Sequence, residues 1–274
     1  MTQADAIKPI RALARPKALA IASIAGLITV GWLYLAVTLA GVSGGTSILE
    51  VLCQPMFGTS AFGMAQAMLV FAMWCAMALA MMLPTAAPMI LTYADIAEAA
   101  AAKGEPAASP SILTAGYILV WLGSAIGLAT VQLVLARLSL LDPAMRSASP
   151  LFSGAVFIMA GAYQFSALKR ACVTQCQHPF RFFFANWTSE PGGVFRLGVR
   201  QGIYCLGCCW AMMLLMFAVG VMNVVWMAAL GAAMTIEKIS TTMRFSRALG
   251  VFFIVAGAAF ISSSVIAHWP ARAG

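Results

Sequence analysis

Long apolar runs alternate with short polar segments along most of the chain. A basic segment at residues 1–17 precedes the first run at 18–40, and further runs lie at 63–93, 111–135, 151–168, 199–221, 223–237 and 248–267. Runs of about 20 apolar residues are long enough to cross a bilayer as helices, whereas a barrel strand shows roughly 10 residues of alternating polarity. The pattern predicts an all-α, polytopic transmembrane bundle of about seven spans in one integral membrane domain over residues 1–274.

Two of these runs differ from a simple span. The run at 63–93 contains Pro84 and Pro88, so we expect a kink and irregular last turns before a polar linker that begins near Asp95. The short run that ends near Glu237 either crosses the membrane or re-enters from one side, and re-entry would move the C-terminus to the cytoplasm.

The basic residues indicate the orientation of the bundle. If the N-terminus is cytoplasmic and seven spans cross, only Arg137, Arg146 and Arg272 lie outside. The cytoplasmic side then carries Lys8, Arg11, Arg15, Lys17, Lys103, Lys169, Arg170, Arg181, Arg196, Arg200, Lys238, Arg244 and Arg247. This distribution follows the positive-inside rule. It favours a cytoplasmic N-terminus, with residues 1–17 as a basic cytoplasmic segment.

Composition supports the bilayer as the main partner of this chain. Hydrophobic residues make up 62% of the 274 positions and charged residues 9%, whereas soluble domains carry about 25% charged residues. The net charge of +8 is spread over short clusters between apolar runs, so it indicates topology and not nucleic-acid binding. Between residues 169 and 200, Arg181 is surrounded by aromatic residues, which predicts a cytoplasmic-side interfacial segment.

Five of the seven cysteines lie near the ends of two successive runs. Cys172 and Cys176 are spaced i, i+4, and Cys205, Cys208 and Cys209 are spaced i, i+3, i+4. On helices, each group points its sulfur atoms to one side, so the two thiol faces can meet. Thiolates bind Cu(I) and zinc, although buried cysteine also fills helix contacts as a small hydrophobe.

Methionines extend this pattern toward the middle of the bundle. Met77 and Met81 lie on the run at 63–93, and Met212 and Met213 continue the run at 199–221. Antiparallel counting at about 1.5 Å per residue puts Met81 level with the Cys208–Cys209 pair and Met77 level with Met212 and Met213. Thioether and thiolate ligands together favour Cu(I) over zinc, while the alternative is that methionine fills gaps between kinked helices.

Other polar residues leave two interpretations open. His178 either completes a metal site with Cys176 or is an exposed ring in an interfacial turn. Glu237 and Lys238 form a buried pair or, as we expect, snorkel to the interface. We expect Cys53 to be a loop thiol on the outer side of the membrane. The sequence has no Rossmann, phosphate-loop or Ser/His/Asp pattern, so an enzyme is not favoured.

Several strings resemble those of a known bacterial family. They are Met73-Trp74-Cys75-Ala76-Met77, Ala80-Met81-Met82-Leu83-Pro84-Thr85, Tyr163-Gln164, Leu168-Lys169, Cys172 to Cys176, Cys205-Leu206-Gly207-Cys208-Cys209-Trp210-Ala211-Met212, Met222-Asn223, Trp226-Met227 and Glu237-Lys238. Over residues 64–240 the chain resembles predicted metal-binding integral membrane proteins, some of which are described as copper chaperones. The resemblance implies metal binding in a bacterial inner membrane.

These observations lead to one main hypothesis and two alternatives. The chain binds a soft metal, Cu(I) before zinc, and transports it or delivers it to a partner enzyme. The ligands would be Cys172, Cys176, Cys205, Cys208, Cys209, Met77, Met81, Met212, Met213 and His178. The alternatives, which need no bound metal, are a membrane subunit of a redox complex with thiol chemistry and a structural subunit that anchors a larger membrane complex.

Overall fold

The described structure is built from helices. The computed structural model describes residues 16–40, 64–141, 147, 149–221, 223–240 and 242–268, and these contain no strand beyond an isolated bridge between Leu141 and Ser147. The helices are α2 (Pro16–Ala40), α4 (Met64–Ala102), α5 (Pro110–Arg137), α6 (Pro150–Tyr163), α7 (Ala167–Gln177), α8 (Pro179–Ala185), α9 (Pro191–Val219), α10 (Val224–Ile239) and α11 (Arg244–His268). The all-α prediction is confirmed.

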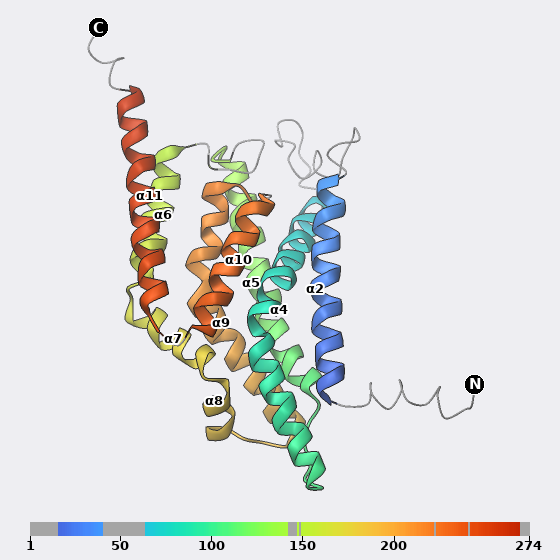
Figure 1. Ribbon diagram of the computed structural model, residues 1–274. Helices are drawn as coiled ribbons and strands as arrows, with labels where there is room; N and C mark the ends of the chain where they lie inside the picture. Colours follow the sequence, from blue (N-terminus) through green and yellow to red (C-terminus); the bar gives the residue numbers. More distant parts are fainter. Residues whose placement is uncertain are drawn as a thin grey trace, which may run out of the picture.

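The long helices form one antiparallel bundle (Figure 1). Helices α2, α5, α9 and α11 run in one direction, and α4, α6 and α10 run in the other. Helices α6 and α11 pair at one edge, and α2 packs on α4 at the opposite edge. The short helices α7 and α8 lie at the end of the bundle where α4 ends and α11 begins. This end also holds the start of α9.

Several of these helices have the dimensions of membrane spans. In the described residues, α4, α5, α9 and α11 are long and apolar enough to cross a bilayer. Helices α6 and α7 meet at an angle of 64° and together make a fifth candidate if they form one broken span. In α2 a shorter apolar stretch covers Ile24–Leu33. A membrane-spanning bundle is therefore indicated, while the number of about seven spans stays a prediction.

The sequence marks the helix ends with capping residues. Proline occupies the first turn of α5, α6, α8 and α9, where its missing N–H costs no hydrogen bond. Side chains of Ser109, Ser149, Ser166 and Asn223 accept backbone N–H groups at the starts of α5, α6, α7 and α10. Gly220 ends α9 with a φ of 105°, a conformation that side chains with a Cβ rarely adopt.

The expectation of irregular last turns in the second run is wrong. Helix α4 continues through Pro84 and Pro88 and past Asp95 to Ala102, where we expected a polar linker. Its last turns are rich in alanine, the strongest helix former. Tyr93 anchors this extension, because its ring packs against Phe183 and its hydroxyl donates to the carbonyl of Ala108 at 3.0 Å. The end of α4 thereby contacts α8.

Glycines allow α5 and α9 to approach each other at backbone contact. A Cβ atom added at Gly198 would lie 2.0 Å from the Leu113 carbonyl oxygen, and one added at Gly116 would lie 2.3 Å from the Phe195 carbonyl oxygen. Neither position therefore accepts a larger residue without separating the helices. The close approach brings Tyr117 of α5 next to Cys205 of α9.

Candidate metal centre

Three thiols gather on the buried face of α9. Cys205, Cys208 and Cys209 are each exposed by 2% or less. The sulfur of Cys208 lies 3.2 Å from the sulfur of Cys209, and the Cys208 thiol donates to the Cys205 carbonyl oxygen at 3.1 Å. The spacing i, i+3, i+4 keeps these residues on neighbouring parts of the helix surface. They form a compact sulfur cluster inside the bundle.

Helix α7 turns its two cysteines toward this cluster. Cys176 is half-buried, and its thiol lies close enough to that of Cys208 for the two groups to interact. Cys172 packs against Gly207, where an added Cβ would lie 2.7 Å from the Cys172 sulfur. The two thiol faces expected from the sequence therefore meet. We call Cys176, Cys205, Cys208 and Cys209 the thiol cluster, and Cys172 lies beside it.

A buried lysine completes the surroundings of Cys205. The Lys238 ammonium donates to the Cys205 sulfur at 2.9 Å and to the Thr85 hydroxyl oxygen at 2.6 Å. The Tyr117 hydroxyl lies 3.0 Å from the same sulfur. Side chains from α5 and α10 thus converge on one thiol of α9, and Thr85 of α4 is joined to them through Lys238. Lys238 is only 7% exposed, so its charged ammonium is buried away from water.

The hydroxyl groups of Thr85 and Tyr117 share one backbone acceptor, which lies close to Pro84 in the sequence. Both Thr85 and Tyr117 donate to the Met82 carbonyl oxygen, at 2.8 and 3.1 Å. With its hydrogen donated there, Thr85 presents its oxygen to the Lys238 ammonium. Satisfied networks of buried polar groups hold their members in fixed positions. Lys238 is therefore oriented toward the cluster by a chain of hydrogen bonds.

Glu237 and Lys238 do not snorkel, and they do not pair with each other. Glu237 is 2% exposed and receives the Lys169 ammonium at 2.6 Å and the Ser246 hydroxyl at 2.6 Å. Lys169 also donates to the Cys208 carbonyl oxygen at 2.5 Å. Adjacent helical residues point about 100° apart, so Glu237 faces α7 and α11 while Lys238 faces the thiol cluster. The interfacial expectation for both residues is wrong.

The four methionines of the sequence hypothesis lie in the core of the bundle. Met77, Met81, Met212 and Met213 are each exposed by 2% or less. Trp74 of α4 and Phe217 of α9 are in ring contact at 5.5 Å, and Lys238 joins Thr85 of α4 to Cys205 of α9. Between these two contacts the antiparallel register puts Met77 level with Met212 and Met213. Their part in metal binding stays a prediction.

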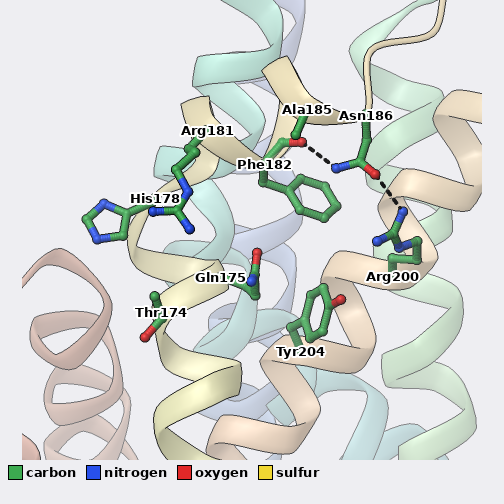
Figure 2. Close-up of a pocket in the computed structure, with 9 residues that line it drawn as sticks. All are labelled: Thr174, Gln175, His178, Arg181, Phe182, Ala185, Asn186, Arg200 and Tyr204. Carbon is green, nitrogen blue, oxygen red and sulfur yellow. Dashed lines mark hydrogen bonds between the residues drawn. The ribbon is translucent and has the colours of Figure 1, made fainter.

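His178 lies apart from the thiol cluster. It is exposed at the junction of α7 and α8, where it lines a pocket with Arg181 and Arg200 (Figure 2). Cys53 lies outside the described residues. The structure therefore brings together sulfur donors without a histidine.

The donor set fits a soft ion of low coordination number. Across the described parts of the chain, no group of three or more His, Cys, Asp and Glu side chains is arranged to hold a metal ion. A structural zinc site needs four such ligands in a tetrahedron. Two neighbouring thiolates are the soft ligands that Cu(I) accepts. The sulfur donors of the cluster therefore fit a soft metal ion.

Comparison with known proteins supports the same metal. A family model described as PpoB2, copper chaperone, matches residues 71–260. The chain belongs to the PpoB2 copper chaperone family. The match includes all five cysteines of α7 and α9, Lys169, Glu237 and Lys238. No curated protein and no solved structure matches the chain. Membership in the PpoB2 family links the chain to copper and agrees with the resemblance seen in the sequence.

Three residues around the cluster were not proposed from the sequence as site residues. Tyr117 and Ser246 carry no motif, and Thr85 appears only within a string shared with the family. A tyrosine inside an apolar run is a signal, because a buried phenol needs a hydrogen-bond partner. The two partners of the Tyr117 hydroxyl, Met82 and Cys205, lie 35 and 88 residues away along the chain, so only the fold identifies them.

Proposed function

We propose that this protein binds Cu(I) within a membrane and delivers it to a partner enzyme. The thiol cluster would hold the ion, with Cys172 beside it and the core methionines continuing the route toward the opposite end of the bundle. The single observation that carries the proposal is the meeting of thiols from α7 and α9 next to the Lys238 ammonium. Family membership supports copper as the metal.

The charges at the cluster favour a monovalent ion. A metal-bound thiol is deprotonated, so Cu(I) with two thiolates carries one net negative charge. Burying a net charge in an apolar interior is costly unless an opposite charge lies close by. Lys238 supplies one positive charge at hydrogen-bond distance from Cys205. A divalent ion with the same ligands would leave an excess positive charge.

We further propose a bacterial inner-membrane location with a cytoplasmic N-terminus. The end of the bundle near the cluster carries the α4–α5 connection, α7, α8 and the first turns of α9 and α11. These segments contain Lys103, Arg170, Arg181, Arg196, Arg244 and Arg247, as expected for the cytoplasmic side. Residues 169–200 would lie along this interface, with exposed Phe180 and Phe184 toward lipid.

Copper content of the purified protein tests the proposal. The protein is loaded with Cu(I) in detergent under reducing conditions, and copper and zinc per chain are measured. We expect close to one copper in the wild type and in Cys75→Ser, whose thiol lies on α4 away from the cluster, and strong loss in the double variant Cys205→Ser/Cys208→Ser. Equal copper in the wild type and the double variant would overturn the thiol site.

A further inference from the structure

A polar pocket opens at the end of the bundle, between α7, α8 and the first half of α9 (Figure 2). Its volume is about 250 Å³. Pockets for drug-sized ligands measure about 300–1,000 Å³, so this one suits a single small polar group. The described lining residues are Thr174, Gln175, His178, Arg181, Phe182, Ala185, Asn186, Arg200 and Tyr204.

The described lining contains two arginines and no carboxylate that would balance them. Figure 2 shows Arg181 and His178 on one side of the Phe182 ring, and Arg200 with Asn186 on the other. The Arg200 guanidinium is held in place, because it donates to the Asn186 side-chain oxygen at 2.9 Å and lies 5.6 Å from the centre of the Phe182 ring. Within the described ranges, no hydrogen bond or ion pair joins Arg181 to another residue. Planar guanidinium groups with free donors bind phosphate oxygens.

The length of α9 puts the pocket at the depth of lipid headgroups. From Arg200 to Val219 the helix rises about 28 Å, close to the roughly 30 Å of a hydrocarbon core. If Val219 lies at one boundary of the core, Arg200 lies at the other. Both Arg181 and Arg200 are exposed on the protein, so a headgroup can reach them from outside the bundle.

Helix α8 presents an apolar face beside the pocket. Phe180 and Phe184 are 62% and 80% exposed, and their rings stack with centroids 6.1 Å apart. Arg181 and Ala185 follow them by one position each and line the pocket. Successive helical residues point about 100° apart, so one short helix offers aromatic rings to acyl chains and a guanidinium to a headgroup. A free anion would use only the second of these features, which favours a lipid.

The remaining polar lining favours one class of headgroup. Thr174 and Tyr204 bring hydroxyl groups and Gln175 an amide, which can hydrogen-bond to the hydroxyl groups of a glycerol headgroup. An ethanolamine headgroup would instead place an ammonium beside two arginines, with no carboxylate in the described lining to receive it. Basic pockets between helices at the cytoplasmic side of a membrane bind anionic headgroups in this way.

We propose that the pocket binds the phosphate of an anionic phospholipid and prefers phosphatidylglycerol to phosphatidylethanolamine. Arg181 and Arg200 would hold the phosphate, while Phe180 and Phe184 contact the acyl chains. This inference goes beyond copper binding and does not depend on it.

Native mass spectrometry of the delipidated protein in detergent tests the inference. Dioleoyl-phosphatidylglycerol and dioleoyl-phosphatidylethanolamine are titrated separately, and the affinity for the first bound lipid is measured. Each arginine near an anionic headgroup strengthens binding about fivefold, so Arg181→Gln/Arg200→Gln should bind phosphatidylglycerol about 10-fold or more weakly. Its affinity for phosphatidylethanolamine should change little. Arg170→Gln/Arg196→Gln removes the same charge from two exposed positions outside the pocket lining and should match the wild type.

Three results would overturn the inference. The first is equal affinity of the wild type and Arg181→Gln/Arg200→Gln for phosphatidylglycerol, and the second is a wild type that binds the two lipids equally. The third is inorganic phosphate that stabilises the wild type against thermal unfolding as strongly as phosphatidylglycerol, which would identify a site for a free anion. If the double variant does not fold, Arg181→Gln replaces it with Arg196→Gln as its control, because the Arg181 side chain makes no hydrogen bond within the described ranges.

Discussion

The Lys238 ammonium lies 2.9 Å from the Cys205 sulfur in the buried interior of the helix bundle. Its second hydrogen bond goes to the Thr85 hydroxyl and not to the carboxylate of Glu237, which receives Lys169. A buried cation is costly unless an anion or several dipoles compensate it. The pairing of this lysine with a thiol would therefore suit the Cu(I) site that we propose, because the cluster would become anionic if its thiolates bound Cu(I).

Replacement of Lys238 by methionine should weaken Cu(I) binding. Residues that support metal ligands without touching the metal typically change metal affinity 10–100-fold, so we expect a loss of about 10–100-fold. Competition with a chromophoric Cu(I) chelator measures the affinity. Lys103→Met, at an exposed position at the end of α4, provides the control. Unchanged affinity in Lys238→Met would show that the ammonium does not stabilise the bound ion.

Removal of the Glu237 charge should destabilise the fold. In Glu237→Gln the buried Lys169 ammonium loses its carboxylate partner, and breaking one side of a buried ion pair costs about 3–5 kcal/mol. Thermal unfolding in detergent should show a clearly lower transition temperature, with exposed Glu105→Gln as the control. The double variant Lys169→Met/Glu237→Met should recover much of the loss, because it leaves no unpaired buried charge. A double variant as unstable as Glu237→Gln would argue against the charge explanation.

A methyl group at Gly198 should separate α5 from α9. The added Cβ would lie 2.0 Å from the Leu113 carbonyl oxygen, and backbone on both sides cannot yield as a flexible side chain can. We expect Gly198→Ala to lower the unfolding temperature and to weaken Cu(I) binding, since Tyr117 would move away from Cys205. Gly192→Ala, in the first turn of the same helix with nothing within 4 Å, should be tolerated. Similar stability of the two variants would contradict the close backbone contact.

The long apolar runs predicted the positions of the helices well. They did not predict that α4 continues past Asp95 to Ala102. Every predicted run overlaps a helix of the described structure, because apolar length is a property of the local sequence, although the run at 151–168 is broken where α6 ends at Tyr163. The end of α4 was predicted as a linker, because Pro84, Pro88 and Asp95 are all helix-breaking or polar signals. What keeps this segment helical is tertiary: Tyr93 packs against Phe183, a residue 90 positions later that no local pattern connects to it.

The same division holds at the candidate site. Helical spacing predicted that the cysteines of α7 and α9 face each other, and the contact between Cys176 and Cys208 confirms it; metal binding by these thiols stays a prediction. The spacing could not predict which way Glu237 and Lys238 point, because charged residues near the end of a short run resemble interfacial residues. Their partners come from other helices: Lys169 for Glu237, and Thr85 and Cys205 for Lys238.

The hydrogen bonds of Glu237 and Lys238 bear on how helix α10 sits in a bilayer. At 16 residues it covers about 24 Å, less than the roughly 30 Å of a hydrocarbon core, so hydrophobic matching alone would leave its depth poorly determined. Glu237 and Lys238 instead fix its depth and rotation against the other helices. A thicker or thinner bilayer would therefore tilt the long outer helices and leave the distance between ammonium and sulfur unaltered.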